Sequence, residues 1–176
     1  MDVYGDMLAD DYEDIEAMQE QEILLRRLER WSDVRDLLER KQETVDASER
    51  VTIMMEMARL CDERLGASSE ASEIYGRILL EQPALQDARS AMERIFKAEE
   101  QWEALGESLE ARLELARASE DEDAIAAATY RLTEILAGKL GEMDRAQEML
   151  KEVLERRPDD VHGILSLADV YEARGD

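Results

Sequence analysis

Two stretches of this sequence share one pattern: LGASSEASEIYGRILLEQP at residues 65–83 and LGEMDRAQEMLKEVLERRP at residues 140–158. In the first stretch a glycine, an alanine, a tyrosine and a proline follow one another at steps of five, four and eight residues. The second stretch repeats these steps 75 positions later, with leucine in place of tyrosine. Such repetition is typical of a stack of similar units, each of which buries its apolar face against the next. The pattern predicts a protein that binds other proteins.

The composition favours helices throughout the chain of 176 residues. Ala, Leu, Glu and Arg are abundant, whereas there are 8 glycines, 2 prolines and no asparagine. Apolar residues recur every three or four positions nearly everywhere, as in Trp31, Val34, Leu37 and Leu38. This spacing places them on one face of a helix. The sequence therefore predicts an all-α fold of about nine helices, with short connections that make neighbouring helices antiparallel.

The helix ends have local signals. Gly66 and Gly141 suit the left-handed residue that ends a helix, and each proline of the two stretches stops the helix before it. Asp46 and Ser119 are each followed three residues later by a glutamate, which is the spacing of an N-terminal capping box. We expect helices to begin after both residues.

These features resemble the tetratricopeptide repeat (TPR) family of 34-residue helix–turn–helix units. The best match is the last unit. At the fourth, seventh, eighth, eleventh and fifteenth positions of the repeat pattern it has Ile164, Leu167, Ala168, Tyr171 and Gly175. In the units that begin at residues 51 and 126, the stretch before the glycine is one residue longer than usual, which predicts a slightly longer first helix. Two degenerate units align through Trp31 and Trp102, whose matched positions indicate packing rather than ligand stacking. The expected units lie near 15–48, 51–85, 86–119 and 126–160, with a partial unit at 161–176, so that the array covers residues 13–176.

The resemblance, which is to long TPR arrays of bacteria, implies an α–α superhelix: a solenoid of antiparallel helix pairs whose first helices line a concave surface. It also implies a non-catalytic scaffold for protein–protein interaction, which binds a peptide or protein surface there. The expected partner-binding residues on that concave face are Arg26, Met55, Arg59, Arg94, Lys97, Tyr130, Glu134 and Asp169.

The charges of these residues are unevenly distributed. The four basic residues come from the first three units, the apolar Met55 and Tyr130 from the second and fourth, and the acidic ones from the last two. A bound segment would then be apolar in the middle, with opposite charges at its two ends. The alternative is that these are ordinary solvated charges on a carboxylate-rich surface.

The formal net charge is −23, which disfavours nucleic acid and anionic lipid as partners. Residues 1–22 hold nine carboxylates and no basic residue, and residues 1–12 are expected to form a solvated acidic tail. An alternative function is therefore an acidic sequestering module, which would bind a basic protein or mimic the charge of a nucleic acid.

Patterns for catalysis, metals or cofactors are weak. Cys61 and His162 are the one cysteine and the one histidine. They belong to different repeat units, and Cys61 stands at a position that is normally part of the core. Asp159 and His162 have the spacing of a carboxylate–histidine metal pair, but a di-metal site needs a second such pair. We expect no enzyme activity, no cofactor and no metal site, with His162 on the surface near a helix start.

The single cysteine and the absence of a signal-peptide pattern favour the cytoplasm, and no apolar run is long enough to span a membrane. The sequence ends where the second helix of a unit is expected. We interpret the chain as a piece of a longer array; self-association through the C-terminal helix is the alternative.

Overall fold

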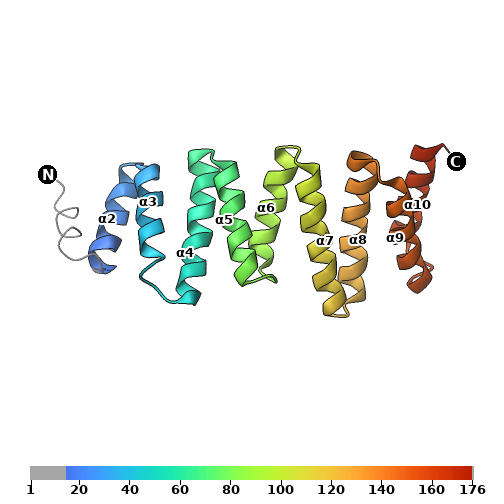
Figure 1. Ribbon diagram of the computed structural model, residues 1–176, viewed down its shortest axis with the longest axis horizontal. Coiled ribbons are helices and arrows are strands. Elements are labelled where there is room, and N and C mark those ends of the chain that lie inside the picture. The colour runs from blue at the N-terminus through green and yellow to red at the C-terminus, as the bar shows by residue number, and fades with distance from the viewer. Residues whose placement is uncertain (1–14, 176) are drawn as a thin grey trace. The chain divides into compact units, whose positions relative to one another are not determined.

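The computed structural model describes residues 15–175, with side chains from residue 17 onward (Figure 1). These residues form nine α-helices: α2 (Ile15–Arg27), α3 (Trp31–Lys41), α4 (Ala47–Leu60), α5 (Ser68–Glu81), α6 (Gln86–Ala98), α7 (Trp102–Ala118), α8 (Glu122–Ile135), α9 (Met143–Arg156) and α10 (Val161–Arg174). No β-strand occurs within this range. The predicted all-α fold of helices packed sequentially in pairs is confirmed. The expected acidic tail, residues 1–12, lies outside the described range.

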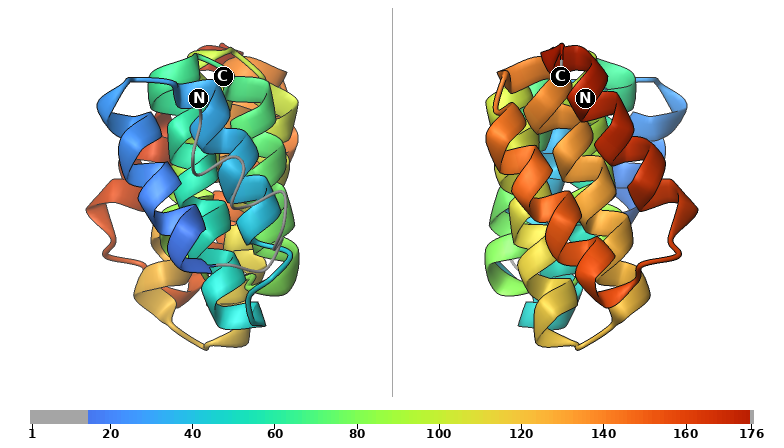
Figure 2. Two further views of the ribbon diagram at one scale, coloured as in Figure 1. Left: turned by 90° about the vertical axis from the view of Figure 1, so that its left-hand side faces the viewer. Right: turned by 90° about the vertical axis from the view of Figure 1, so that its right-hand side faces the viewer.

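The chain divides into two compact units, with the division between Met92 and Glu93 inside α6. In unit 1, α2 pairs with α3 and α4 pairs with α5, while α3 also packs against α4. In unit 2, α7 packs against α8, α8 against α9, and α10 against both α8 and α9. The right-hand view of Figure 2 shows α10 beside these two helices. In both units consecutive helices are therefore neighbours, as short connections require.

Two helices end in a π-helical turn, where the hydrogen bonds span one residue more than in an α-helix. The turns are η1 (Cys61–Leu65) after α4 and η2 (Leu136–Leu140) after α8. Gly66 and Gly141 follow them with φ of 62° and 72°, the predicted left-handed conformation. The one additional residue in each of these units therefore widens the last turn, rather than adding an ordinary α-helical residue.

The two predicted capping boxes have different outcomes. Asp46 caps α4, and its carboxylate accepts hydrogen bonds from the backbone N–H groups of Ser48 and Glu49 at 2.9 and 3.0 Å. The prediction for Ser119 is wrong, because this residue closes α7 and its hydroxyl donates to the carbonyl of Ala116 at 2.9 Å. Glu120 takes a left-handed φ of 54°, so the start of α8 moves two residues along the chain and Asp121 becomes its cap.

Small residues let the paired helices approach closely. Ala58 and Ala71 are fully buried between α4 and α5 of unit 1, beside the buried ring of Tyr75. Ala146 and Leu150 have the same places in unit 2 and are equally buried. In each unit the buried core thus includes these small side chains together with a large one, as the repeated stretches predict.

The two tryptophans have matching surroundings. Trp31 and Trp102 are the first residues of α3 and α7, and each is half-buried. Arg64 of η1 lies over the ring of Trp31 at 5.2 Å, and Lys139 of η2 lies over that of Trp102 at 4.5 Å. These cation–π contacts use one side of each ring, and Trp102 also packs partly against the apolar core. The matched positions therefore correspond to one structural role.

Among the described residues no helix is long and apolar enough to cross a membrane. On α10, three apolar side chains remain largely exposed, Val161 at 68%, Ile164 at 47% and Leu165 at 60%.

Candidate binding site

All eight expected partner-binding residues lie on first helices of the expected units. Unit 1 contains three of them: Arg26 on α2 and Met55 and Arg59 on α4. Unit 2 contains the other five: Arg94 and Lys97 on α6, Tyr130 and Glu134 on α8, and Asp169 on α10. We describe the two sets separately.

In unit 2 the structure brings Tyr130, Glu134 and Asp169 together. They line a cavity of about 430 Å³, here called the α8–α10 pocket. From α8 and η2 the lining also includes Thr133 and Ala137, and from α10 it includes His162, Val170 and Ala173. These side chains come from positions up to 43 residues apart in the sequence, and they meet because α10 packs back against α8.

The aromatic wall of this pocket is held in place by its neighbours. The ring centroids of Tyr130 and His162 are 4.4 Å apart, and the ring planes are inclined at 43°. Burial raises the pKa of Tyr130 to about 12, and the neighbouring Asp160 carboxylate adds to the shift. Asp160 also caps α10, accepting from the N–H groups of His162 and Gly163 at 3.1 and 3.2 Å. The phenol is therefore neutral at physiological pH.

The charge of the pocket is negative. Its lining contains the carboxylates of Glu134 and Asp169, both exposed, and neither lysine nor arginine is among the described residues that line it. Within the described part of unit 2, neither carboxylate forms an ion pair shorter than 4 Å. The pocket therefore combines two aromatic rings, the apolar side chains of Ala137, Val170 and Ala173, and two carboxylates that have no cationic partner in this unit.

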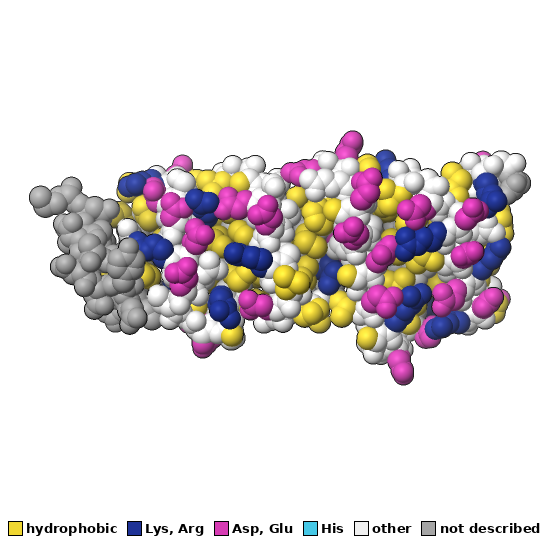
Figure 3. Space-filling view, in the orientation of Figure 1, with side chains coloured by type: hydrophobic (Ala, Val, Ile, Leu, Met, Phe, Trp, Pro, Cys, Tyr) yellow, Lys and Arg dark blue, Asp and Glu magenta, His cyan; other side chains and the backbone are white. Residues whose placement is uncertain are grey.

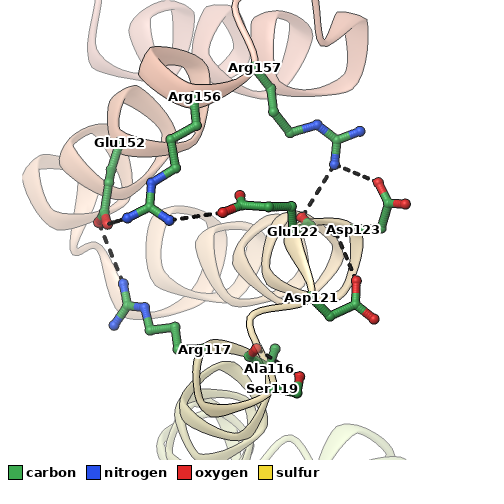
Figure 4. Close-up of polar contacts among 9 residues, drawn as sticks. All are labelled: Ala116, Arg117, Ser119, Asp121, Glu122, Asp123, Glu152, Arg156 and Arg157. Atoms are coloured by element: carbon green, nitrogen blue, oxygen red, sulfur yellow. Dashed lines mark hydrogen bonds and ion pairs between the residues drawn. The ribbon is translucent and has the colours of Figure 1, made fainter.

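Between α7, α8 and α9, in contrast, the carboxylates are paired with arginines of the chain (Figure 4). There Glu152 accepts from both Arg117 and Arg156, at 3.5 Å each, and Arg156 also contacts Glu122 at 3.2 Å. Basic and acidic side chains are interspersed over α8 and α9 in Figure 3. The recess beside these ion pairs encloses only about 10 Å³. Carboxylates there are neutralised by the chain itself, and no room is left for a ligand.

In unit 1, Arg26 and Arg59 line a second cavity of about 210 Å³, together with Trp31 and Arg64. Arg26 is already paired with Glu22 at 2.9 Å and with Glu56 at 2.5 Å. Arg59 is exposed and has Asp87 at 3.9 Å. Arg26 is therefore already ion-paired within its own surface.

The remaining predicted residues lie outside these cavities. Met55 is half-buried on α4 and does not line the unit 1 cavity. Arg94 and Lys97 are exposed on the last two turns of α6 and line neither of the two cavities.

The TPR resemblance implies a concave-face position for His162 as well, but the eight expected partner-binding residues do not include it. The structure places it at the start of α10, exposed, as predicted for a surface histidine, but also as one wall of the pocket. Among the described residues, no group of three or more His, Cys, Asp or Glu side chains could hold a metal ion.

No protein-family model matches this sequence, and no curated protein matches it significantly. Among solved structures, that of the MamA protein aligns with a TM-score of 0.51 at 15% identity, covering 90% of this chain and 81% of MamA. MamA AMB-1 in its P212121 form aligns with a TM-score of 0.50 at 21% identity, with the same coverage of both chains. At these identities the likeness concerns the fold alone. The chain is structurally similar, over nine-tenths of its length, to MamA, a TPR-repeat protein.

Proposed function

We propose that this protein is a non-catalytic scaffold that binds a peptide or protein surface along the first helices of its repeat units. The observation that carries the proposal is the α8–α10 pocket, where Tyr130, Glu134 and Asp169 line one cavity of about 430 Å³. Its volume lies in the range of roughly 300–1,000 Å³ that is common for ligand pockets. We assign the units near 15–48, 51–85, 86–119 and 126–160, with a partial unit from residue 161.

The state of the one cysteine argues against nucleophilic catalysis by this residue. Cys61 is fully buried in unit 1. Burial raises the pKa of its thiol to about 11, with the Glu70 carboxylate as the next cause. A thiol is a nucleophile only as the thiolate, so Cys61 serves as a packing residue at neutral pH.

A pull-down from cell lysate with the full chain tests the proposal. The first variant, Arg59→Glu with Arg94→Glu, reverses two exposed charges on first helices. The second, Tyr130→Ala with Asp169→Lys, alters the α8–α10 pocket. The matched control, Arg77→Glu with Lys151→Glu, reverses two exposed charges on the second helices α5 and α9.

We expect the control to retain the partner that the wild type captures, and both first-helix variants to lose it while keeping their helical circular dichroism. Equal capture by all four proteins would contradict binding along the first helices. If binding instead weakens steeply with salt and depends on residues 1–22, the acidic sequestering module is the better description.

A further inference from the structure

We propose that the α8–α10 pocket binds the side chain of an arginine in a partner peptide. This inference rests on the proposed function and names the chemistry that its pocket in unit 2 recognises. Three properties of the pocket support it: the charge, the aromatic wall and the apolar floor.

The charge of the pocket calls for a cation. Glu134 on α8 and Asp169 on α10 face one cavity from two helices, and no lysine or arginine is among its described lining residues. Several other exposed carboxylates of unit 2 have arginine partners, as Glu110 has Arg145 at 2.6 Å. A ligand guanidinium would occupy the position that arginines of the chain occupy at those sites.

The aromatic wall adds an attraction for the same group. A cation within about 6 Å of a tyrosine ring is attracted by the electrons of its face. The chain makes this interaction internally, since Arg64 and Lys139 lie 5.2 and 4.5 Å from tryptophan ring centres. In the pocket, the centroids of the Tyr130 and His162 rings are 4.4 Å apart. Because this contact already restricts the Tyr130 ring, the ring loses less conformational entropy when a ligand binds.

The floor of the pocket suits the rest of an arginine side chain. Ala137, Val170 and Ala173 present apolar surface, against which the three methylene groups of arginine can pack while the charged head stays near the carboxylates. Arginine fits better than lysine because its planar fork of five N–H donors can serve two carboxylates at once and can stack on an aromatic ring.

The single histidine of the chain provides a direct probe of this pocket. Because His162 is the one histidine in the sequence, its imidazole carbon-bound protons give one unambiguous set of NMR signals. We would titrate the full chain at constant pH and salt with an acetylated, amidated heptapeptide that has one central arginine among alanines and glycines. Three further peptides replace the arginine by citrulline, lysine or glutamate. Citrulline keeps the shape and loses the charge.

We expect the arginine peptide to shift the His162 signals saturably. The citrulline and glutamate peptides should bind at least about tenfold more weakly, since a charge-assisted hydrogen bond is much stronger than a neutral one. Equal binding of the arginine and citrulline peptides, or no shift with any peptide, would overturn the proposal. A stronger effect of the lysine peptide would overturn the choice of arginine.

Variants then locate the site. Glu134→Gln with Asp169→Asn removes the two pocket charges and should weaken binding of the arginine peptide at least about tenfold. Glu148→Gln with Glu155→Gln removes two exposed charges from α9 outside the pocket lining and should leave binding unchanged. An equal loss in both would indicate general charge attraction and contradict a specific pocket.

Failure of this inference and failure of the proposed function are distinguishable. If the arginine peptide does not bind but the first-helix variants still lose the captured partner, the scaffold function stands and the arginine assignment falls. If the peptide binds as expected and no variant affects capture, the pocket chemistry stands and the scaffold function falls.

Discussion

Glu93 is the most deeply buried acidic residue described, with 3% of its surface exposed. Its carboxylate accepts two hydrogen bonds from Arg112 of α7, at 3.0 and 3.1 Å, and one from Arg131 of α8, at 2.8 Å. A buried charge costs several kcal/mol of desolvation unless it is paired and hydrogen-bonded. Glu93 is both, and its ion pairs connect α6 to α7 and α8.

Glu93→Gln is therefore expected to lower the free energy of unfolding by about 1.5–3 kcal/mol, since it weakens the hydrogen bonds of two arginines that both keep contact with solvent. Glu103→Gln, at an exposed position of α7, serves as the control and should have almost no effect. Urea unfolding followed by circular dichroism measures both variants. Similar midpoints for the two would contradict the importance of the buried ion pairs.

Asp160 makes the stability of α10 depend on pH. The Tyr130 hydroxyl and the N–H of Gly163 hold the pKa of Asp160 below its ordinary value of 3.8. A carboxylate whose pKa is lowered by folding stabilises the protein above that ordinary value, and the stabilisation disappears as the pH falls through the folded-state pKa.

Asparagine is an equally good N-cap without the charge. We expect the wild type to melt at a higher temperature than Asp160→Asn at pH 7, and the difference to be smaller at about pH 3, below the ordinary value of 3.8. Thermal melts of both proteins at the two pH values provide the measurement. A difference of the same size at both would contradict a charge-dependent cap.

Among the helices, the ends of α4 and α8 show how one additional residue changes local geometry. The backbone N–H of Ala67 donates to the carbonyl of Cys61 at 2.8 Å, and Glu142 donates to Leu136 at the same distance. These bonds close the π-helical turns through a left-handed glycine, Gly66 or Gly141. The lengthened turns also carry Arg64 and Lys139, the cations that lie over the two tryptophan rings.

Two glycines of unit 1 should therefore respond oppositely to alanine. Gly66→Ala forces a side chain into a φ of 62° and should cost about 1 kcal/mol. Gly76→Ala lies inside α5, where an added Cβ meets nothing within 4 Å, and should stabilise by about 0.5–1 kcal/mol. Chemical denaturation of the two variants tests this; a shift of the same sign in both would refute the assignment.

The contact between paired helices depends on small side chains. Ala71→Leu or Ala146→Leu introduces three carbon atoms at a fully buried position and should cost about 1–3 kcal/mol through overpacking. Ala111→Leu, on the exposed side of α7, is the matched control and should be nearly neutral. An unchanged thermal melt for either buried variant would argue against close packing at that alanine.

Over the whole chain, acidic residues outnumber basic ones by 45 to 22. Many arginines in both units already pair with neighbouring carboxylates, as Arg35 does with Glu70 at 2.7 Å and Arg145 with Glu110 at 2.6 Å. The remaining charge is mostly negative, and such self-repulsion destabilises the folded state.

Raising NaCl from about 10 to about 150 mM shortens the Debye length from about 30 to about 8 Å. We expect the melting temperature to rise, because the long-range repulsion is screened more completely than the ion pairs in contact. Differential scanning calorimetry over a salt series measures this. A melting temperature that falls with salt would show that the ion pairs contribute more than the net repulsion costs.

The exposed apolar side chains of α10 could form the contact in the predicted self-association, which remains a prediction. Light scattering at several protein concentrations distinguishes a monomer from a dimer. The variant Leu165→Lys, at a position that is 60% exposed, should abolish any dimer that uses this face and leave the monomer folded.

The amino-acid sequence determined the helices, their order, the left-handed glycines and the buried alanines. These features depend on spacing and on the intrinsic preferences of residues near in the chain. It did not indicate the π-helical geometry, the cap at Asp121 or the partners of Glu93, which stand 19 and 38 residues away. Only the tertiary structure decided that four side chains line one cavity, those of Tyr130, His162, Glu134 and Asp169. The physical reason is that a pocket forms between packed helices, whereas the periodicity of one helix does not determine which side chains of another helix face it.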